Sequence, residues 1–208
     1  MKKITKKDFI IGVDSSTTAA KAIVWDKKGN CVVEAREDIP LLTPHTDWVE
    51  QRAGDWWDAT AKSIYTAVQH IDPNRIAAIG ITHQRESFVP LNKELNPVRN
   101  GILWTDTRTT TQVKWLRDKC GEKVHKITGR FPNLYASNVK IMWIRENEPA
   151  IFKNIYKYLD VAAYLYLKLT GKFVTTWPSA CPMGIVDISN HCWSKEILDL
   201  HTYTSSFP

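Results

Sequence analysis

Short apolar runs with polar residues at their ends dominate the start of the chain and predict β-strands. Residues 9–13 (FIIGV) form one run that ends at Asp14, and residues 22–25 (AIVW) form a second run after a cluster of serines and threonines. Two such runs around a turn-rich segment are typical of a hairpin. Residues 27–30 (KKGN) predict a second tight turn, and residues 31–39 alternate as a third antiparallel strand does. The opening of the chain therefore predicts a three-stranded meander.

Apolar residues then recur at helical spacing between residues 53 and 71 and predict an amphipathic helix. These apolar positions are Trp56, Ala59, Ile64, Ala67, Val68 and Ile71. The segment 72–74 (DPN) ends the helix, and residues 75–82 (RIAAIGIT) form an apolar run that is typical of a buried parallel strand. A strand, a helix and a returning parallel strand form a crossover unit. The pattern therefore predicts an α/β domain with a mixed sheet flanked by helices.

The remainder of the chain predicts a mixture of helices and short strands. Helices are expected at residues 112–119, ending at Gly121, and at residues 139–147, 149–158, 162–170 and 193–200. Strands are expected at residues 88–91, 173–176 and 184–188.

Composition and charge exclude several classes of function. The 28 Lys and Arg residues outnumber the 22 Asp and Glu residues, but the excess is concentrated only in the short KKITKK start, so we expect no nucleic-acid binding. No apolar run approaches the ~18 residues of a membrane span, and the start lacks the apolar core of a signal peptide. The four cysteines show no CxxC spacing, which favours free thiols in a reducing, cytoplasmic protein.

Two segments carry residues suited to binding chemistry. The hairpin tip combines the carboxylate of Asp14 with a row of hydroxyls and backbone N–H groups, which are the parts needed to hold a metal-bound polyphosphate. The alternative is an ordinary turn rich in serine and threonine. Arg85 and Glu86 follow the predicted parallel strand, where α/β sheets place binding residues. Together they could grip a vicinal diol with donors and acceptors, or they could simply form a surface ion pair.

Five stretches follow one another in the order and at the spacings of a known family: GVDSSTTAAKAIVWD, DWVEQRAGDWWDA, IAAIGITHQRES, NGILWTDTRT and ITGRFPNLYASNVKIMWI. Together they give the chain a resemblance to the N-terminal half of the FGGY carbohydrate kinase family, which includes glycerol kinase and xylulokinase. The resemblance implies an actin-like (ribonuclease H-like) ATPase fold of two domains. Residues 1–208 would form an incomplete N-terminal domain, and the second, nucleotide-binding domain would be absent.

The resemblance also implies phosphate-binding roles near the hairpin tip. Asp14 matches the residue that holds Mg²⁺, often through water, and Thr17 and Thr18 match residues that meet the ATP phosphates. Lys21 stands where glycerol kinase has an arginine that faces the phosphates. A lysine still supplies a point charge there, although it lacks the bidentate fork of arginine.

Acceptor-binding roles follow from the same resemblance. Arg85 and Glu86 match the pair that hydrogen-bonds substrate hydroxyls, and Gln84 flanks the pocket. Trp104 and Tyr135 match aromatic residues that line the pocket, with core packing as the alternative.

Asp106 matches the acidic residue of the pattern ILWxDxR. It is expected either to reach substrate or to cap the helix that follows.

The function implied is ATP- and Mg²⁺-dependent phosphorylation of a primary hydroxyl of a small sugar or polyol. The catalytic base is expected beyond residue 208, so we expect the chain alone to be nearly inactive and to pair with a missing C-terminal kinase domain or with a second copy of itself. The QRE triplet points to a glycerol-like polyol, whereas ILWTDTR points to a ketopentose such as xylulose. A non-catalytic carbohydrate-binding or regulatory module and another actin-like ATPase are the alternatives.

Overall fold

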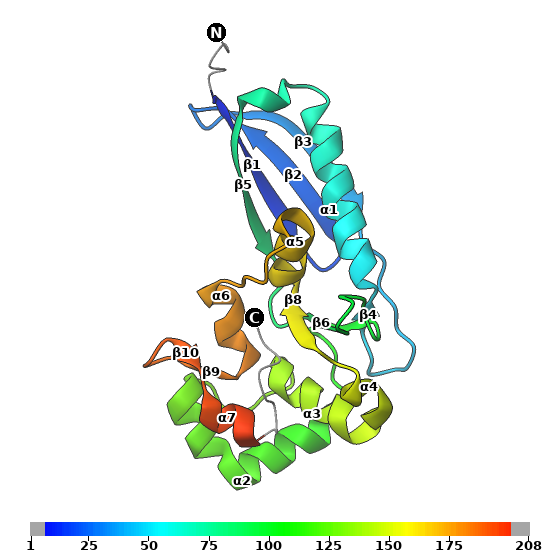
Figure 1. Ribbon diagram of the computed structural model, residues 1–208, viewed down its shortest axis with the longest axis vertical. Coiled ribbons are helices and arrows are strands. Elements are labelled where there is room, and N and C mark those ends of the chain that lie inside the picture. Colours follow the sequence, from blue (N-terminus) through cyan, green and yellow to red (C-terminus); the bar gives the residue numbers. More distant parts are fainter. Residues whose placement is uncertain (1–6, 201–208) are drawn as a thin grey trace. The chain divides into compact units, whose positions relative to one another are not determined.

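The computed structural model describes residues 7–200, which divide into two compact units (Figure 1). The N-terminal unit contains residues 7–40 and Gly54–Gln84. The C-terminal unit contains Leu41–Ala53 and residues 85–200. None of the helices between residues 7 and 200 combines the length and apolar character that crossing a membrane requires.

The N-terminal unit is built on a four-stranded mixed sheet of order β3-β2-β1-β5. Its strands are β1 (Phe9–Ser15), β2 (Ala19–Trp25), β3 (Cys31–Asp38) and β5 (Ile76–His83). β1 pairs with β2, and β2 with β3, in antiparallel register, while β1 and β5 run parallel. The predicted meander and the crossover into a parallel strand are therefore confirmed.

Helix α1 (Ala53–Val68) covers one face of this sheet. Alternation along β1 turns Ile11 and Val13 to the helix side, where they pack with Val24 of β2 and Ala67 of α1 in one buried cluster. A 3₁₀ turn, η1 (Pro73–Arg75), follows, and the Asp72 side chain accepts a hydrogen bond from the backbone N–H of Asn74.

The expectation that residues 75–82 form a buried strand is wrong in one respect. β5 is parallel to β1 as predicted, but Ala77, Ala78, Ile79 and Gly80 are exposed, and the Ile79 side chain is 43% exposed. β5 is the last strand in the sheet order, so within the described residues it has a partner strand on one side only. An apolar run is buried only where a neighbouring strand or helix covers it.

The C-terminal unit contains a second, antiparallel sheet of order β4-β7-β6-β8. The strands are β4 (Glu50–Gln51), β6 (Phe88–Leu91), β7 (Gly101–Ile102) and β8 (Lys157–Asp160), and a separate pair is formed by β9 (Val186–Asp187) and β10 (Cys192–Trp193). The helices are α2 (Thr110–Thr128), α3 (Ser137–Asn147), α4 (Pro149–Lys153), α5 (Val161–Thr170), α6 (Trp177–Ala180), the 3₁₀ turn η2 (Cys181–Met183) and α7 (Lys195–Leu200).

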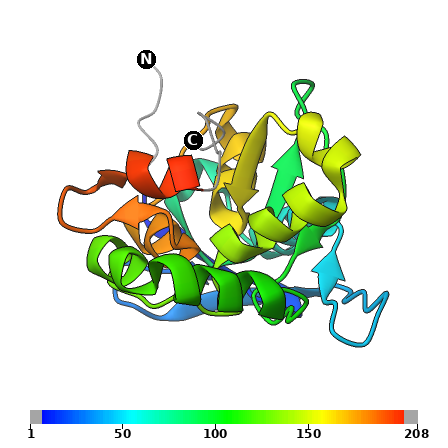
Figure 2. The ribbon, with the colours of Figure 1, turned by 90° about the horizontal axis from the view of Figure 1, so that it is seen from below.

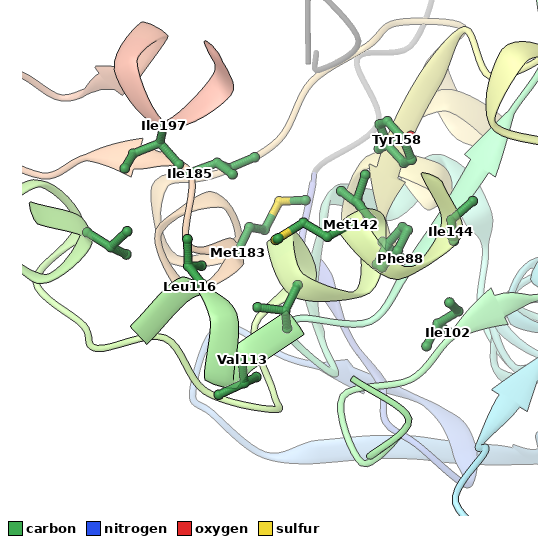
Figure 3. Packing of buried hydrophobic residues seen from close by; sticks show 13 residues of the cluster. Phe88, Ile102, Val113, Leu116, Met142, Ile144, Tyr158, Met183, Ile185 and Ile197 are labelled. Carbon is green, nitrogen blue, oxygen red and sulfur yellow. The ribbon is translucent and has the colours of Figure 1, made fainter. Parts of the chain in front are cut away.

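One hydrophobic cluster joins these elements (Figure 3). Helices α2 and α3 pack against each other (Figure 2) and contribute Leu116 and Met142 to this cluster, which also contains Phe88 of β6 and Ile197 of α7. These side chains are almost fully buried, so the cluster ties the helices to the sheet of this unit.

Three of the expected elements in this unit differ from the structure. α2 runs through Gly121 to Thr128, and its C-cap Gly129 adopts the left-handed conformation (φ 73°). The helix expected at 149–158 is α4 followed by strand β8, and residues 173–176 form no strand. A glycine inside a helix costs about 1 kcal/mol, which the packing of α2 offsets.

Candidate functional site

The turn between β1 and β2 carries the threonines predicted to meet phosphates. The backbone N–H and the hydroxyl of Ser16 both donate to the carbonyl of Ala19 at 2.9 Å and close the turn. Thr17 is half-buried and Thr18 is exposed. Because Ser16 holds the turn, neither threonine hydroxyl is needed to close it.

Asp14 and Lys21 lie directly opposite each other on β1 and β2 and therefore share one face of the sheet. Asp14 is exposed, and its carboxylate makes no hydrogen bond or ion pair within residues 7–200. The Lys21 ammonium lies 3.1 Å from the Glu34 carboxylate of β3. Both partners are partly exposed, and such a pair contributes little stability, so Lys21 can exchange Glu34 for another anion at low cost.

Gln84 lies against the same turn. The parallel pairing of β1 with β5 puts His83 opposite Ser15, so the residue after β5 meets the hairpin. The backbone N–H of Gln84 donates to the Ser15 carbonyl at 3.0 Å, and the side-chain Oε1 of Gln84 accepts from the Thr17 hydroxyl at 3.4 Å. The structure thus places Gln84 with the residues predicted to bind phosphates, in the N-terminal unit.

This arrangement fits a magnesium ion bound to a phosphate chain. Mg²⁺ is commonly held by one or two carboxylates together with phosphate oxygens and waters. Asp14 offers such a carboxylate beside the hydroxyls of the turn. Among the described residues no three His, Cys, Asp or Glu side chains gather into a group that could hold a metal ion.

In the C-terminal unit, Glu86 is held in a strained conformation at a predicted binding position. Its φ is 67°, in the left-handed region, and non-glycine residues in that region cluster at functional sites. The Arg130 guanidinium donates to Glu86 Oε1 at 2.6 Å, and the Ser137 hydroxyl donates to the Glu86 carbonyl at 2.8 Å. Arg85 is exposed and makes no ion pair with Glu86. The alternative of an Arg85–Glu86 ion pair is therefore wrong.

Trp104 and Tyr135 form an aromatic pair at the surface of this unit. Their ring centroids are 5.9 Å apart and tilted by 47°. Trp104 is 36% exposed and Tyr135 is 48% exposed, so the alternative of core packing is wrong for both. The backbone N–H of Trp104 donates to the Ser87 hydroxyl at 3.0 Å, which ties the pair to the residue that follows Glu86. Two partly exposed rings provide flat apolar surface that a sugar can contact.

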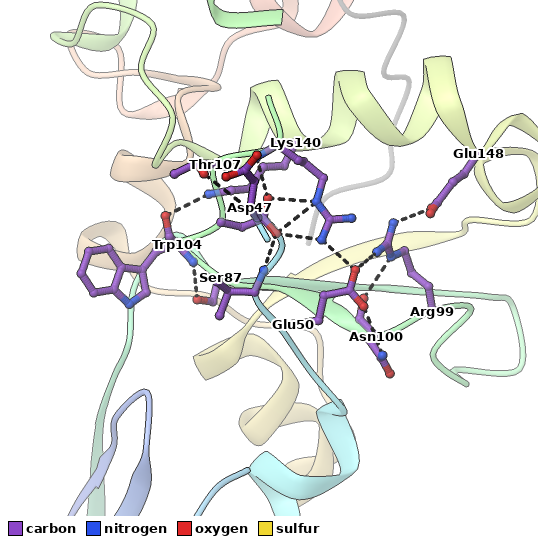
Figure 4. A network of polar contacts seen from close by, with 12 residues as sticks. Asp47, Glu50, Ser87, Arg99, Asn100, Trp104, Thr107, Lys140 and Glu148 are labelled. Atoms are coloured by element: carbon purple, nitrogen blue, oxygen red, sulfur yellow. Dashed lines mark hydrogen bonds and ion pairs between the residues drawn. The ribbon is translucent and has the colours of Figure 1, made fainter. Parts of the chain in front are cut away.

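Asp106 is part of a buried ionic network that continues through Glu50. Figure 4 shows the part of this network formed by Glu50, Arg99 and Glu148. Asp106 is 0% exposed, and its carboxylate accepts from Arg108 Nε and Nη2 and from the backbone N–H of Val49 at 2.7–3.0 Å. Arg108 Nη2 also reaches Glu50 at 2.7 Å, and its guanidinium lies 3.8 Å from the centroid of the Trp48 ring. The burial and bonding of Asp106 favour a structural role over contact with substrate.

The expectation that Asp106 caps the following helix is wrong. The N-cap of α2 is Thr109, and its side chain makes no capping hydrogen bond. Instead, the Asp106 carboxylate turns back toward Arg108 and the segment around Val49.

Comparison with known proteins places these features in a family. A family model described as "FGGY family of carbohydrate kinases, N-terminal domain" matches residues 9–207. The chain belongs to this family. It is 32% identical over 198 residues to a glycerol kinase of Thermococcus kodakarensis, with 92% of the chain and 40% of the relative covered. It is 31% identical over 194 residues to a xylulose kinase of Lactococcus lactis, covering 92% of the chain and 38% of the relative.

A solved FGGY kinase has the same fold. The structure of a ligand-bound xylulose kinase from Lactobacillus acidophilus matches with a TM-score of 0.91 at 27% identity, covering 95% of the chain and 40% of that protein. The expected fold class, an actin-like ATPase domain with a mixed sheet, is confirmed. The chain spans about two fifths of the length of the relatives it matches.

Two residues of this FGGY chain lie at the candidate site in addition to those predicted from the sequence. Arg130 directly follows the C-cap Gly129 of α2 and pairs with Glu86. Lys140 of α3 is 0% exposed, and burial lowers the pKa of its amine to about 7 from the usual 10.5, against the opposing effect of the carboxylates of Asp106 and Glu86. The sequence signal for Lys140 was a lysine inside the otherwise apolar run VKIMWI, because lysine is almost never fully buried without partners.

Proposed function

We propose that this chain is the part of an FGGY kinase that binds the acceptor and the nucleotide phosphates. The complete enzyme would transfer the terminal phosphoryl group of ATP to a primary hydroxyl of a small sugar or polyol. The observation that carries the acceptor assignment is the linked set of Glu86, Trp104 and Tyr135. They come from three separate segments of the C-terminal unit and are tied together through hydrogen bonds of Ser87 and Ser137.

The acceptor would be bound by complementary polar and apolar contacts. One carboxylate oxygen of Glu86 is engaged by Arg130, which leaves Oε2 to accept from a hydroxyl of the acceptor. The exposed Arg85 would donate to a neighbouring hydroxyl. The rings of Trp104 and Tyr135 would pack against the carbon skeleton.

The phosphates would be bound at the hairpin turn of the N-terminal unit. Asp14 would hold Mg²⁺ through water, Thr17 and Thr18 would donate to phosphate oxygens, and Lys21 would exchange Glu34 for a phosphate. Mg²⁺, when bound, neutralises negative charge on the phosphate oxygens. Phosphoryl transfer depends mainly on such positioning and charge neutralisation, so these residues need supply no covalent chemistry.

The rest of the enzyme would supply the general base and the adenine site. The open edge of the N-terminal sheet supports this proposal, because β5 has a partner strand on one side only among the described residues and its Ile79 is 43% exposed. An exposed strand edge is a surface that another chain can pair with or cover. Either a C-terminal kinase domain or a second copy of the chain would cover it, and sedimentation velocity over a range of concentrations distinguishes a dimer from a monomer.

The acceptor assignment can be tested by calorimetric titration of the chain with glycerol, erythritol, ribulose and xylulose. We expect saturable binding of at least one of them, weakened at least 10-fold in Arg85→Ala and in Glu86→Gln. Arg36→Ala is the matched control, because Arg36 is an exposed arginine on β3 whose ion-pair partner is Asp38. Equal affinity of Arg85→Ala and the wild-type chain would refute the assignment.

A further inference from the structure

Lys140 makes two hydrogen bonds, and both end on the aromatic residues of the candidate acceptor site. Its Nζ donates to the backbone carbonyl of Tyr135 at 2.8 Å. It also donates to the backbone carbonyl of Trp104 at 3.2 Å (Figure 4). Tyr135 precedes α3, and Trp104 follows β7. One side chain thus bridges two segments that are 31 positions apart in the sequence and that carry the exposed ring pair.

We propose that Lys140 is a positioning residue for the acceptor site, which fixes the Trp104–Tyr135 pair by bridging their backbones. This proposal rests on the proposed function only for the identity of the acceptor that the rings of Trp104 and Tyr135 contact. Side chains that bind a substrate must be held within a fraction of an ångström, and second-layer hydrogen bonds commonly supply that constraint. The Trp104 backbone is held on one side by Ser87 and on the other by Lys140.

The protonation state of Lys140 gives this bridge a measurable signature. A neutral amine has two N–H donors, which matches the two carbonyls that it contacts. An ammonium has a third donor. The charged groups that act on Lys140 are Asp106, Glu86 and Arg108. Protonation of the Lys140 amine adds a positive charge and a third N–H that has no partner among the described residues. Because the amine contacts the backbone of Trp104, we expect the local environment of Trp104 to change when the amine is protonated.

The variant Lys140→Met tests whether Lys140 positions Trp104 and Tyr135 or only stabilises the fold. Methionine has nearly the length of lysine and no donor, and it fits an apolar site. Because it also removes a buried amine, we expect the variant to remain folded at neutral pH. Lys114→Met is the matched control, because Lys114 is an exposed lysine on α2 whose partner is Asp118.

The experiment labels the tryptophans with 5-fluorotryptophan and follows the Trp104 resonance by ¹⁹F NMR, assigned with Trp104→Phe. Without any acceptor, we expect this resonance to titrate with a midpoint near pH 7 in the wild type and in Lys114→Met, and to lose that titration in Lys140→Met. A Trp104 resonance that titrates identically in Lys140→Met would overturn the proposal.

A second arm measures acceptor affinity by calorimetry at pH 8. We expect Lys140→Met to weaken binding at least 10-fold and Lys114→Met to leave it unchanged. Wild-type affinity in a folded Lys140→Met chain would overturn the positioning role. If no acceptor binds even the wild type, the proposed function fails, while the ¹⁹F titration still decides whether Lys140 controls Trp104.

Discussion

Replacing Lys140 by methionine should change how the stability of the C-terminal unit depends on pH. The folded chain lowers the pKa of Lys140 from 10.5 to about 7 because the amine is buried. Between these two values the unfolded chain binds a proton that the folded chain does not, so the contribution of Lys140 to stability rises as the pH rises. Below about pH 7 the amine of Lys140 is protonated in both the folded and the unfolded chain. Its unfavourable contribution to the free energy of unfolding then no longer changes with pH.

The size of the effect follows from the two pKa values. Each pH unit between the two pKa values contributes up to about 1.4 kcal/mol to the free energy of unfolding. Only part of that range lies between pH 6 and pH 9. The wild type should therefore gain about 2–3 kcal/mol of stability from Lys140 between these two pH values. Other groups titrate in the same range, and therefore the difference between wild type and Lys140→Met is the informative quantity.

The measurement is urea unfolding at pH 6 and pH 9, followed by ¹⁹F NMR of 5-fluorotryptophan at Trp104 so that the C-terminal unit is monitored by itself. The wild type and Lys114→Met should gain the same stability on raising the pH, and Lys140→Met should gain about 2–3 kcal/mol less. If the pH dependence of Lys140→Met equals that of the wild type within about 0.5 kcal/mol, the amine is not buried as the structure has it.

Three further predictions concern other residues. Asp106→Asn should destabilise the chain by about 1.5–3 kcal/mol in urea unfolding, since it removes one of the two carboxylates that pair with the buried Arg108 and leaves Glu50 as the other, whereas a substrate-binding role would reduce acceptor affinity at little cost in stability. Gly184→Ala should lower the free energy of unfolding by about 1–3 kcal/mol in the same assay, because φ is 77° and the new Cβ would lie 2.9 Å from the Asn138 amide nitrogen. An unfolding midpoint equal to that of the wild type would contradict this prediction. Asp14→Asn should weaken calorimetric binding of magnesium pyrophosphate about 10-fold without changing metal-free pyrophosphate binding; an equal loss of both would contradict a metal role.

The N-terminal unit could be predicted well because its signals are local. The alternation in residues 9–39 sets the strands, and the turn segments between them set the antiparallel order. The burial of β5 could not be predicted in the same way. The run IAAIGIT determines that a strand forms, but exposure of Ile79 depends on what lies beyond the edge of the sheet.

The C-terminal unit was predicted less completely because short elements compete there. Residues 149–158 have helical spacing, yet α4 stops at Lys153 and the chain enters β8, whose residues pair with β6. Pairing with a strand some 70 positions earlier in the chain decides this outcome, and no local pattern contains it. Lys140 is a similar case, since its partners are backbone carbonyls that the sequence does not mark.

The two carboxylates expected at the acceptor site have different environments, and this difference bears on substrate choice. Asp106 is fully buried and hydrogen-bonded to Arg108 and Val49. The acidic residue of the ILWTDTR pattern therefore stabilises the buried network, and its burial disfavours contact with a ligand. Glu86 has one oxygen on Arg130 and the other without a partner in the described chain, beside the exposed Arg85. The hypothesis of a ketopentose rests on the pattern ILWTDTR as a whole. The hypothesis of a glycerol-like polyol rests on the QRE triplet, of which Arg85 and Glu86 lie in the C-terminal unit and Gln84 lies at the turn of the N-terminal unit. If Arg85 and Glu86 bind the acceptor as proposed, we expect glycerol or erythritol to bind more tightly than xylulose in the calorimetric titration.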